Sequence, residues 1–90
     1  MKLLFMEPAW RDYLHVQARE PMMLAKLNAL LQECARTPFT GTGKPEPLKR
    51  ELAGWWSRRI NGADRLVYRV RGTGDDQVLE IAQCRFHYKR

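Results

Sequence analysis

Residues 55–71 read WWSRRINGADRLVYRVR and predict two antiparallel strands joined by a turn. The Asn61-Gly62 pair is a strong turn signal, because both residue types tolerate the left-handed backbone of tight hairpins. Apolar and basic residues alternate across residues 65–71, as expected for a strand that buries one face. One face should carry Leu66, Tyr68 and Val70 into the core, and the other should carry Arg65, Val67, Arg69 and Arg71 away from it.

Further strands and a long loop extend this hairpin on both sides. Residues 77–84 follow a Gly-containing turn at 72–76 and predict the next strand of an antiparallel meander. The short apolar run at residues 2–6 suits another strand at the start of the sheet. Between residues 37 and 47, three prolines and two glycines interrupt every periodicity, so we expect a loop, followed by one helical turn within residues 47–52.

Two helices should lie between the first strand and this loop. Glu-Pro pairs at residues 7–8 and 20–21 mark their starts, because proline fits the first helical turn, where its missing N–H costs nothing. Each helix carries a mainly apolar stripe of residues at helical spacing. The first stripe is Met6, Trp10, Tyr13, Leu14 and Gln17, and the second is Met23, Leu24, Leu27, Leu30, Leu31 and Cys34. Helices joined by two or three residues should pack as an antiparallel pair.

These elements predict an α+β fold in one domain of residues 1–90, with two N-terminal helices packed on a twisted, mainly antiparallel sheet. Ninety residues fit a single hydrophobic core and leave no room for a second domain. No apolar run approaches the roughly 20 residues of a membrane span, and the apolar start at residues 1–6 is too short for a secretory signal. We therefore expect a cytoplasmic protein without membrane contact.

Cys34 and Cys84 lie far apart in the sequence and form no CxxC pair, which disfavours a disulfide scaffold and a structural zinc site. We interpret both as small buried apolar residues. His15 and His87 are too few to build a metal cluster, and no metal or other cofactor is expected.

The charge of the chain is more informative. Sixteen Lys and Arg against ten Asp and Glu give a net charge of +6, and eleven of the basic residues lie in residues 41–90. A small basic protein attracts polyanions such as RNA, DNA, ribosomal surfaces or acidic protein segments. Several cations on neighbouring strands repel one another unless an anion covers them. We interpret the arginines at 58, 59, 65, 69 and 71 as an RNA phosphate path, the alternative being a solvated face that prevents edge aggregation.

The C-terminal residues 85–90, RFHYKR, interleave aromatic and basic side chains. Aromatic rings stack on unpaired bases while cations hold the phosphate backbone, so this mixture suits single-stranded RNA. Strict alternation along the last strand would place His87 on the core face. We therefore expect a bend or bulge between Gln83 and Phe86 that brings His87 to the cationic side.

Four runs of the chain carry a specific pattern: GKPEPLK at 43–49, WSRRI at 56–60, RLVY at 65–68 and CRFHY at 84–88. In this order and spacing they resemble the YoeB (Txe) family of toxins, within the RelE/ParE superfamily. The resemblance covers nearly the whole chain. It implies a RelE-like fold, similar to small microbial ribonucleases, and a ribosome-dependent endoribonuclease that is the toxin of a type II toxin–antitoxin pair.

The resemblance also implies roles for individual residues. The family's catalytic positions match Glu46, Arg65, His87 and Tyr88. Basic positions thought to contact the RNA backbone match Lys49 and Arg59, and we add Lys44, Arg58, Arg69 and Arg85 as further RNA contacts from the charge pattern. The chain departs from the family at Phe86, where a second tyrosine is common, in a longer turn at 72–76, and in the added residues 89–90.

Elementary RNA chemistry fits these assignments. RNA carries its own nucleophile, so cleavage needs a base for the 2′-hydroxyl proton, a cation for charge on the phosphate oxygens, and an acid for the departing 5′ oxygen. We assign Glu46 as the base, Arg65 as the cation and His87 as the acid, with Tyr88 in a positioning role. The products would be a 2′,3′-cyclic phosphate and a 5′-hydroxyl end.

Two other classes of protein stay open. A ParE-like toxin that acts on DNA gyrase would share the fold but would not need Glu46, Arg65 and His87. A basic ribosome- or RNA-binding module would bind with strong salt dependence and leave RNA uncut. For the enzyme, the expected partners are mRNA in the A site of the 30S or 70S ribosome and a YefM-like antitoxin, whose acidic tail would cover the three residues or displace the chain end. The family also suggests a homodimer formed through the helical face.

Overall fold

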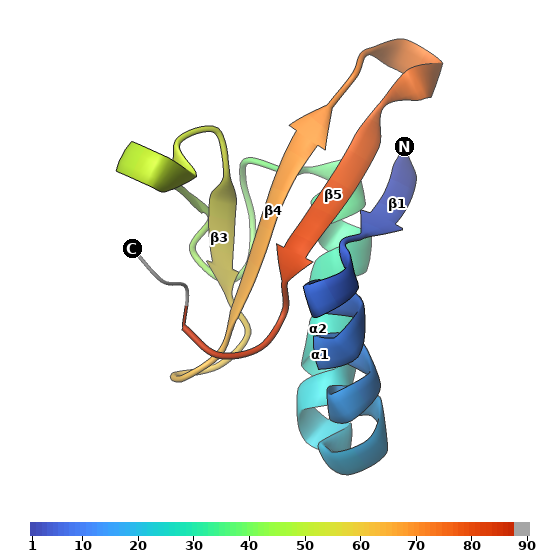
Figure 1. Cartoon of the computed structure of the whole chain (residues 1–90), viewed down its shortest axis with the longest axis vertical. Coiled ribbons are helices and arrows are strands. Elements are labelled where there is room, and N and C mark those ends of the chain that lie inside the picture. The colour runs from blue at the N-terminus through green and yellow to red at the C-terminus, as the bar shows by residue number, and fades with distance from the viewer. Residues whose placement is uncertain (88–90) are drawn as a thin grey trace.

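Two helices cover one face of a five-stranded sheet in the computed structural model, which describes residues 1–87 (Figure 1). The helices and strands are β1 (Lys2–Phe5), α1 (Glu7–Arg19), α2 (Pro21–Arg36), β2 (Glu46–Pro47), β3 (Trp56–Arg59), β4 (Arg65–Arg71) and β5 (Val78–Gln83). The strand order is β1-β5-β4-β3-β2, and β1 is parallel to β5 while all other pairs are antiparallel. The predicted α+β architecture is confirmed.

The predicted strands are confirmed, with ends that differ by at most two residues, and one further strand appears. Glu46 and Pro47 form β2 at the end of the predicted loop, and they pair with Ser57 and Trp56 of β3. The helical turn expected within residues 47–52 is a 3₁₀ turn at Arg50–Leu52. Because Glu46 belongs to the sheet and not to a free loop, its backbone has a fixed place beside β3.

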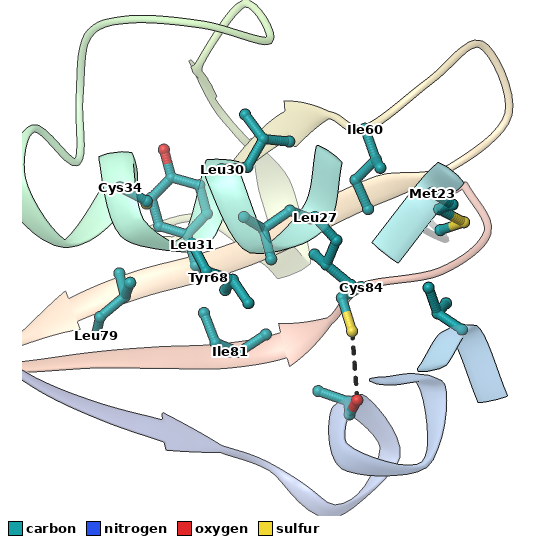
Figure 2. Packing of buried hydrophobic residues seen from close by; sticks show 13 residues of the cluster. Met23, Leu27, Leu30, Leu31, Cys34, Ile60, Tyr68, Leu79, Ile81 and Cys84 are labelled. Atoms are coloured by element: carbon teal, nitrogen blue, oxygen red, sulfur yellow. Dashed lines mark hydrogen bonds between the residues drawn. The ribbon is translucent and has the colours of Figure 1, made fainter. Parts of the chain in front are cut away.

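The predicted apolar stripe of α2 is the main contribution of the helices to the core (Figure 2). Its buried residues are Met23, Leu27, Leu30, Leu31 and Cys34, and they pack against Ile60, Leu66, Tyr68, Leu79 and Ile81 from the sheet side. A single residue, Glu20, separates the two helices. Among the described residues, no helix combines the length and the apolar character needed to span a bilayer.

The stripe expected on α1 is wrong. Ala9 and Val16 are the buried residues of this helix, whereas Trp10 and Leu14 keep 46% and 42% of their surface exposed. The small Ala9 lets the helix approach the end of β5 closely, since the Cys84 thiol donates a hydrogen bond to the Ala9 carbonyl at 3.3 Å. The larger rings stack outside this contact, with Trp10 parallel to Tyr13 at 5.9 Å between ring centres.

Both cysteines are free and buried, as predicted from their spacing. Burial, together with the nearby Asp12 carboxylate, raises the pKa of Cys84 to about 12. The pKa of Cys34 is raised by burial as well. Both side chains therefore stay protonated thiols and pack as small apolar groups.

The last strand bends where the sequence requires it. Val67 pairs with Gln83 but the next residue, Tyr68, pairs with Ile81, so Ala82 is an extra residue in β5. The chain then bends through residues 84–86, which confirms the predicted change of direction before His87. The extra residue shifts the alternation by one position, and Cys84 is buried while His87 is exposed.

Candidate functional site

The sheet face opposite the helices brings together residues from three strands. Strand pairing sets Glu46 against Ser57 and Ser57 against Val67, while Arg59 lies opposite Arg65 in the next row. Trp56 and Leu66 belong to the core side, so these residues share the other side of the sheet. Two directly opposed arginines repel each other unless an anion lies between them.

The guanidinium of Arg65 is held by the turn that precedes it. Its Nη1 donates to the carbonyl oxygens of Asn61 at 2.9 Å, Asp64 at 3.1 Å and Gly62 at 3.4 Å. The Asn61 side chain fixes the same turn by accepting the N–H groups of Ala63 and Asp64, both at 2.8 Å. Within residues 1–87 no hydrogen-bond acceptor contacts Nε or Nη2, which leaves three N–H donors of the guanidinium for a phosphate.

His87 reaches the same end of the sheet through the backbone of Phe86. The Arg65 N–H donates to the Phe86 carbonyl at 2.9 Å, and the Phe86 N–H donates to Asp64 Oδ1 at 2.7 Å. In Figure 1 the segment after β5 crosses to the start of β4, away from the helices. His87 follows this junction directly and is exposed. Tyr88 lies outside the described residues.

Two predicted RNA contacts flank Glu46 along the chain. Lys44 and Lys49 are both exposed, as is Glu46 itself. The segment that carries Lys44 is bound to β3, since the Arg59 N–H donates to the Gly43 carbonyl at 2.7 Å. Gly43 has a φ of +85°, and a Cβ there would lie 2.8 Å from the Arg59 carbonyl, so only glycine allows this approach. This contact holds the chain next to Lys44 beside β3, at the start of the segment that carries Glu46.

The far end of the same face is not a free cationic surface, which corrects the expectation from the arginine pattern. Arg69 donates from Nε to Glu80 at 2.5 Å, and Arg71 donates to the other oxygen of Glu80 at 3.0 Å. Glu80 is nearly buried, with 7% of its side chain exposed. The Arg69 guanidinium also stacks over Trp55 at 4.3 Å. The unbalanced positive charge of this face is therefore concentrated around Arg59 and Arg65.

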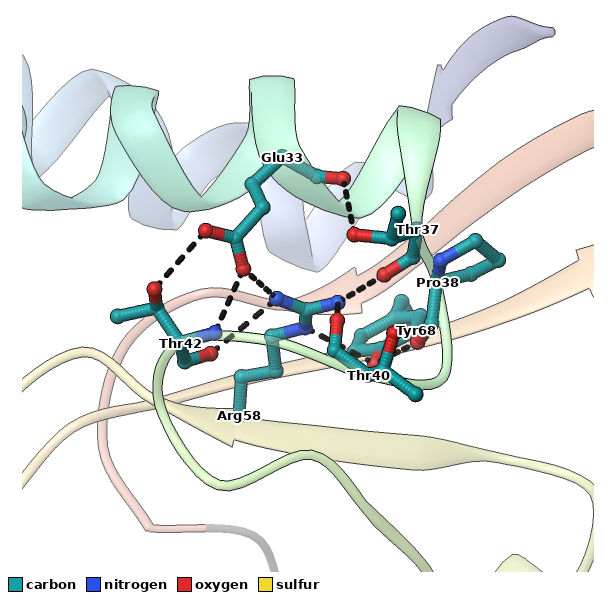
Figure 3. A network of polar contacts seen from close by, with 7 residues as sticks. All are labelled: Glu33, Thr37, Pro38, Thr40, Thr42, Arg58 and Tyr68. Atoms are coloured by element: carbon teal, nitrogen blue, oxygen red, sulfur yellow. Dashed lines mark hydrogen bonds and ion pairs between the residues drawn. The ribbon is translucent and has the colours of Figure 1, made fainter.

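Arg58 does not belong to the outer face at all, and its prediction as an RNA contact is wrong. Neighbouring residues of a strand point to opposite sides, so Arg58 points inward where Arg59 points outward. Its side chain is fully buried between β3 and the loop after α2 (Figure 3). All five N–H donors are used. Nε donates to the Tyr68 hydroxyl, Nη1 to Glu33 and the Thr42 carbonyl, and Nη2 to the Thr37 and Thr40 carbonyls.

We call this group the Arg58 clamp; it comprises Arg58, Glu33, Tyr68 and the loop residues 37–42. The carboxylate of Glu33 accepts the N–H of Thr42 at 2.7 Å and its hydroxyl at 2.9 Å, and these bonds, with Arg58, lower the pKa of Glu33. Burial raises the pKa of Tyr68 to about 12, so its hydroxyl stays protonated and donates to the Pro38 carbonyl at 2.5 Å. The clamp fixes the loop that leads to Glu46.

The sequence interpretation missed three carboxylates that organise this site. Glu33 binds Arg58, Glu80 binds Arg69 and Arg71, and Asp64 binds the Phe86 N–H. Each partner lies at least nine residues away in the sequence, so no local pattern marks the pair. Arg85, predicted to contact RNA, stacks on the Phe86 ring at 4.2 Å and stays half-buried. Across residues 1–87 no three His, Cys, Asp or Glu side chains gather as metal ligands would.

Known proteins match this chain over almost its full length. Residues 5–88 match the family model of the YoeB-like toxin of bacterial type II toxin–antitoxin systems. A toxin YoeB from Synechocystis is 50% identical over 90 residues, which covers 100% of both chains. The solved YoeB/ParE toxin from Agrobacterium tumefaciens is 52% identical with a TM-score of 0.94, covering 98% of this chain and 100% of that one.

A relative from Staphylococcus aureus has been solved in two assemblies. One is a YoeB dimer, with a TM-score of 0.83, and the other is a heterotetrameric YoeB–YefM toxin–antitoxin complex, with a TM-score of 0.84. Both are 42% identical to this chain, and the match covers 98% of each chain. The similarity therefore includes the sheet, both helices and the chain segments that carry the candidate site.

Proposed function

This chain belongs to the YoeB family of toxins of bacterial type II toxin–antitoxin systems, and from that premise we propose that it is a ribosome-dependent endoribonuclease that cuts mRNA in the A site. One observation carries the proposal. Glu46 and Arg65 share the outer face of the sheet, and the backbone of Phe86 ties His87 to Arg65. A carboxylate, a guanidinium and an imidazole are the groups that cleavage of an RNA linkage needs.

The reaction proceeds by attack of the RNA on itself. Glu46 takes the proton of the 2′-hydroxyl, and the 2′ oxygen forms a bond to the adjacent phosphorus. The free side of the Arg65 fork binds the non-bridging oxygens, where negative charge increases in the transition state. His87 gives its proton to the 5′ oxygen as the bond from phosphorus to that oxygen breaks. The products are a 2′,3′-cyclic phosphate and a 5′-hydroxyl, with Tyr88 positioning His87 or the phosphate.

The RNA backbone is held by the cations around these groups. Lys44, Lys49 and Arg59 are exposed near Glu46 and Arg65 and have no carboxylate partner among the described residues. Arg85 adds a cation beside His87, and its stacking on the exposed Phe86 ring presents an aromatic surface for a base. Arg69 contributes less, because Glu80 balances its charge. Binding should weaken steeply with salt.

The partners follow from the same surfaces. An antitoxin with an acidic segment that folds on binding fits the cationic end of the sheet. The S. aureus relative has been solved in complex with the YefM antitoxin. A homodimer is supported by exposed apolar side chains on α1 and the neighbouring β1, and the same relative has been solved as a dimer. These side chains are Leu3, Leu4, Met6, Trp10 and Leu14. The site of action would be the translating ribosome in the cytoplasm.

Translating ribosomes programmed with a defined mRNA give the direct test. The full-length protein should cut the mRNA in the A site and leave 2′,3′-cyclic phosphate and 5′-hydroxyl ends. Glu46→Gln should occupy the same ribosomes and cut about 10²–10⁴-fold more slowly, because a general base contributes about that factor. Ribosome occupancy without cuts, or inhibition of DNA gyrase by the protein, would contradict the proposal and would indicate an RNA-binding module or a ParE-like toxin instead.

A further inference from the structure

The residue before His87 has an unusual backbone. Phe86 adopts a φ of +63°, in the left-handed region that side chains with a Cβ rarely enter. Its ring does not explain this conformation, because 57% of the residue is exposed and the ring contacts Arg85 on the surface. Strained residues of this kind persist only where the surrounding structure holds them, and they gather at functional sites.

Three hydrogen bonds hold the Phe86 backbone. Its N–H donates to Asp64 Oδ1 at 2.7 Å, and its carbonyl accepts the Arg65 N–H at 2.9 Å and the Gln83 side-chain amide at 3.0 Å. The same Gln83 amide also binds the Arg85 carbonyl at 2.8 Å. We call this group, Asp64, Gln83 and the Phe86 backbone, the C-terminal latch.

Asp64 also contacts the cation of the candidate site. Its carbonyl accepts Arg65 Nη1 at 3.1 Å and the Ile60 N–H at 3.0 Å, and its N–H donates to the Asn61 side chain at 2.8 Å. Its backbone therefore helps to orient the Arg65 guanidinium while its carboxylate holds the Phe86 N–H. One residue therefore contacts both the Arg65 guanidinium and the start of the segment that carries His87.

We propose that Asp64 is a positioning residue for His87: its carboxylate holds Phe86 in the left-handed conformation that directs His87 toward the phosphate bound by Arg65. The inference rests on the proposed function, since it concerns how the acid reaches the RNA linkage. Asp64 itself does not touch the RNA or exchange a proton. Its effect should therefore fall on the rate of the chemical step and not on binding.

Cleavage rates on programmed ribosomes separate these two effects. Asp64→Ala should lower the rate at saturating ribosomes about 10- to 100-fold, because a misplacement of about 1 Å has an effect of that size. The ribosome concentration at half-maximal rate should change less than about threefold. Asp64→Asn keeps an oxygen acceptor at the same place and should restore the rate to within about threefold of the parent. Asp75→Ala removes the same charge at the distant exposed turn and should leave both quantities unchanged.

Amide hydrogen exchange gives a second readout that needs no RNA. In the parent and in Asp64→Asn the Phe86 amide should exchange slowly, and in Asp64→Ala it should exchange faster while core amides of β4 keep their protection. Three results would overturn the role of Asp64 without affecting the proposed function. They are a parental cleavage rate in Asp64→Ala, an Asp64→Asn variant as slow as Asp64→Ala, and an unprotected Phe86 amide in the parent. A parent that leaves mRNA uncut would instead overturn the proposed function together with the role of the latch.

Discussion

The two sides of the candidate site are held in opposite ways. On the Glu46 side, Arg58 and Tyr68 of the Arg58 clamp are fully buried, and every donor of the guanidinium has a partner in the loop, in α2 or in β4. On the His87 side, the C-terminal latch lies at the surface and holds a strained residue with three hydrogen bonds. The centre of the clamp therefore belongs to the buried core, whereas the latch lies on the surface of the folded domain.

Because of this difference, changes in the clamp should lower stability, whereas changes in the latch should lower activity. Opening the clamp leaves the buried Arg58 guanidinium and the buried Tyr68 hydroxyl without partners, so the loop that leads to Glu46 should open only when the domain unfolds. Opening the latch breaks hydrogen bonds at the surface and relieves a strained backbone, so the segment with His87 can leave the site while the fold persists. An antitoxin that acts on the chain end needs to compete only with the latch, which makes this side the easier one to silence.

Replacing Arg58 should give the largest change in stability. Arg58→Met keeps the length of the stem but removes the donors for three carbonyls and the Tyr68 hydroxyl. We expect the free energy of unfolding to fall by about 3–5 kcal/mol, as for other buried ionic groups that lose one partner. Urea unfolding measures this directly. Arg59→Met, the exposed neighbour, is the control and should change it by less than about 0.5 kcal/mol; equal effects at the two positions would contradict the comparison.

A smaller change is expected at Tyr68. Tyr68→Phe removes the hydroxyl that accepts from Arg58 Nε and donates to the Pro38 carbonyl, and it leaves both groups buried without that partner. The free energy of unfolding should fall by about 1–3 kcal/mol. The saturating cleavage rate of the folded protein should stay within about threefold of the parent, because β2 still pairs Glu46 with β3. A tenfold slower rate without loss of stability would show that the clamp acts on chemistry.

Acid should affect the two regions with opposite signs. In the clamp, hydrogen bonds from Thr42 and Arg58 lower the pKa of Glu33 below its ordinary value of 4.5. Directly after β5, where the C-terminal segment begins, the Cys84 N–H donates to the Asp12 carboxylate. Burial outweighs this bond and raises the pKa of Asp12 above 3.8. Ionised Glu33 therefore stabilises the folded state, whereas ionised Asp12 destabilises it.

The contribution of Glu33 is complete above pH 4.5 and is lost as pH falls through its lowered pKa, so Glu33→Gln should flatten the acid limb of the stability curve. Asp12→Asn should stabilise the protein at pH 7, and this gain should shrink as pH falls through the raised pKa toward 3.8. Free energies of unfolding measured from pH 7 to pH 3 check both. Parallel pH curves for the parent and Glu33→Gln would contradict the role given to the clamp.

Local patterns in the sequence predicted the elements well and their contacts poorly. The bounds of the strand at 65–71 are confirmed, because alternation depends only on the strand's own geometry, but Val67 on its outer side is buried and not open. The prediction that both Arg58 and Arg59 contact RNA is wrong for Arg58, because neighbouring residues of one strand point in opposite directions. Its partner Glu33 is 25 residues away and becomes visible only when α2 and β3 are packed together.

The exposed stripe of α1 has a similar cause. Apolar spacing shows which residues share a helix face, but it does not show which face meets the sheet. Ala9 approaches Cys84 closely, so the face of α1 that carries Ala9 meets the sheet and Trp10 stays exposed. The shared face of Glu46 and Arg65 depends on strand register, which has no local signal, whereas the alternation along residues 77–87 does indicate the change of direction before His87.

An mRNA with sulfur in place of the bridging 5′ oxygen tests whether Glu46 and His87 act as base and acid on one linkage. A sulfur leaving group departs without a proton, so loss of the acid should no longer matter. His87→Ala should cut normal mRNA about 10²–10⁴-fold more slowly than the parent and cut the sulfur substrate within about tenfold of it, whereas Glu46→Gln should stay slow on both. An equal defect of His87→Ala on the two substrates would contradict the account.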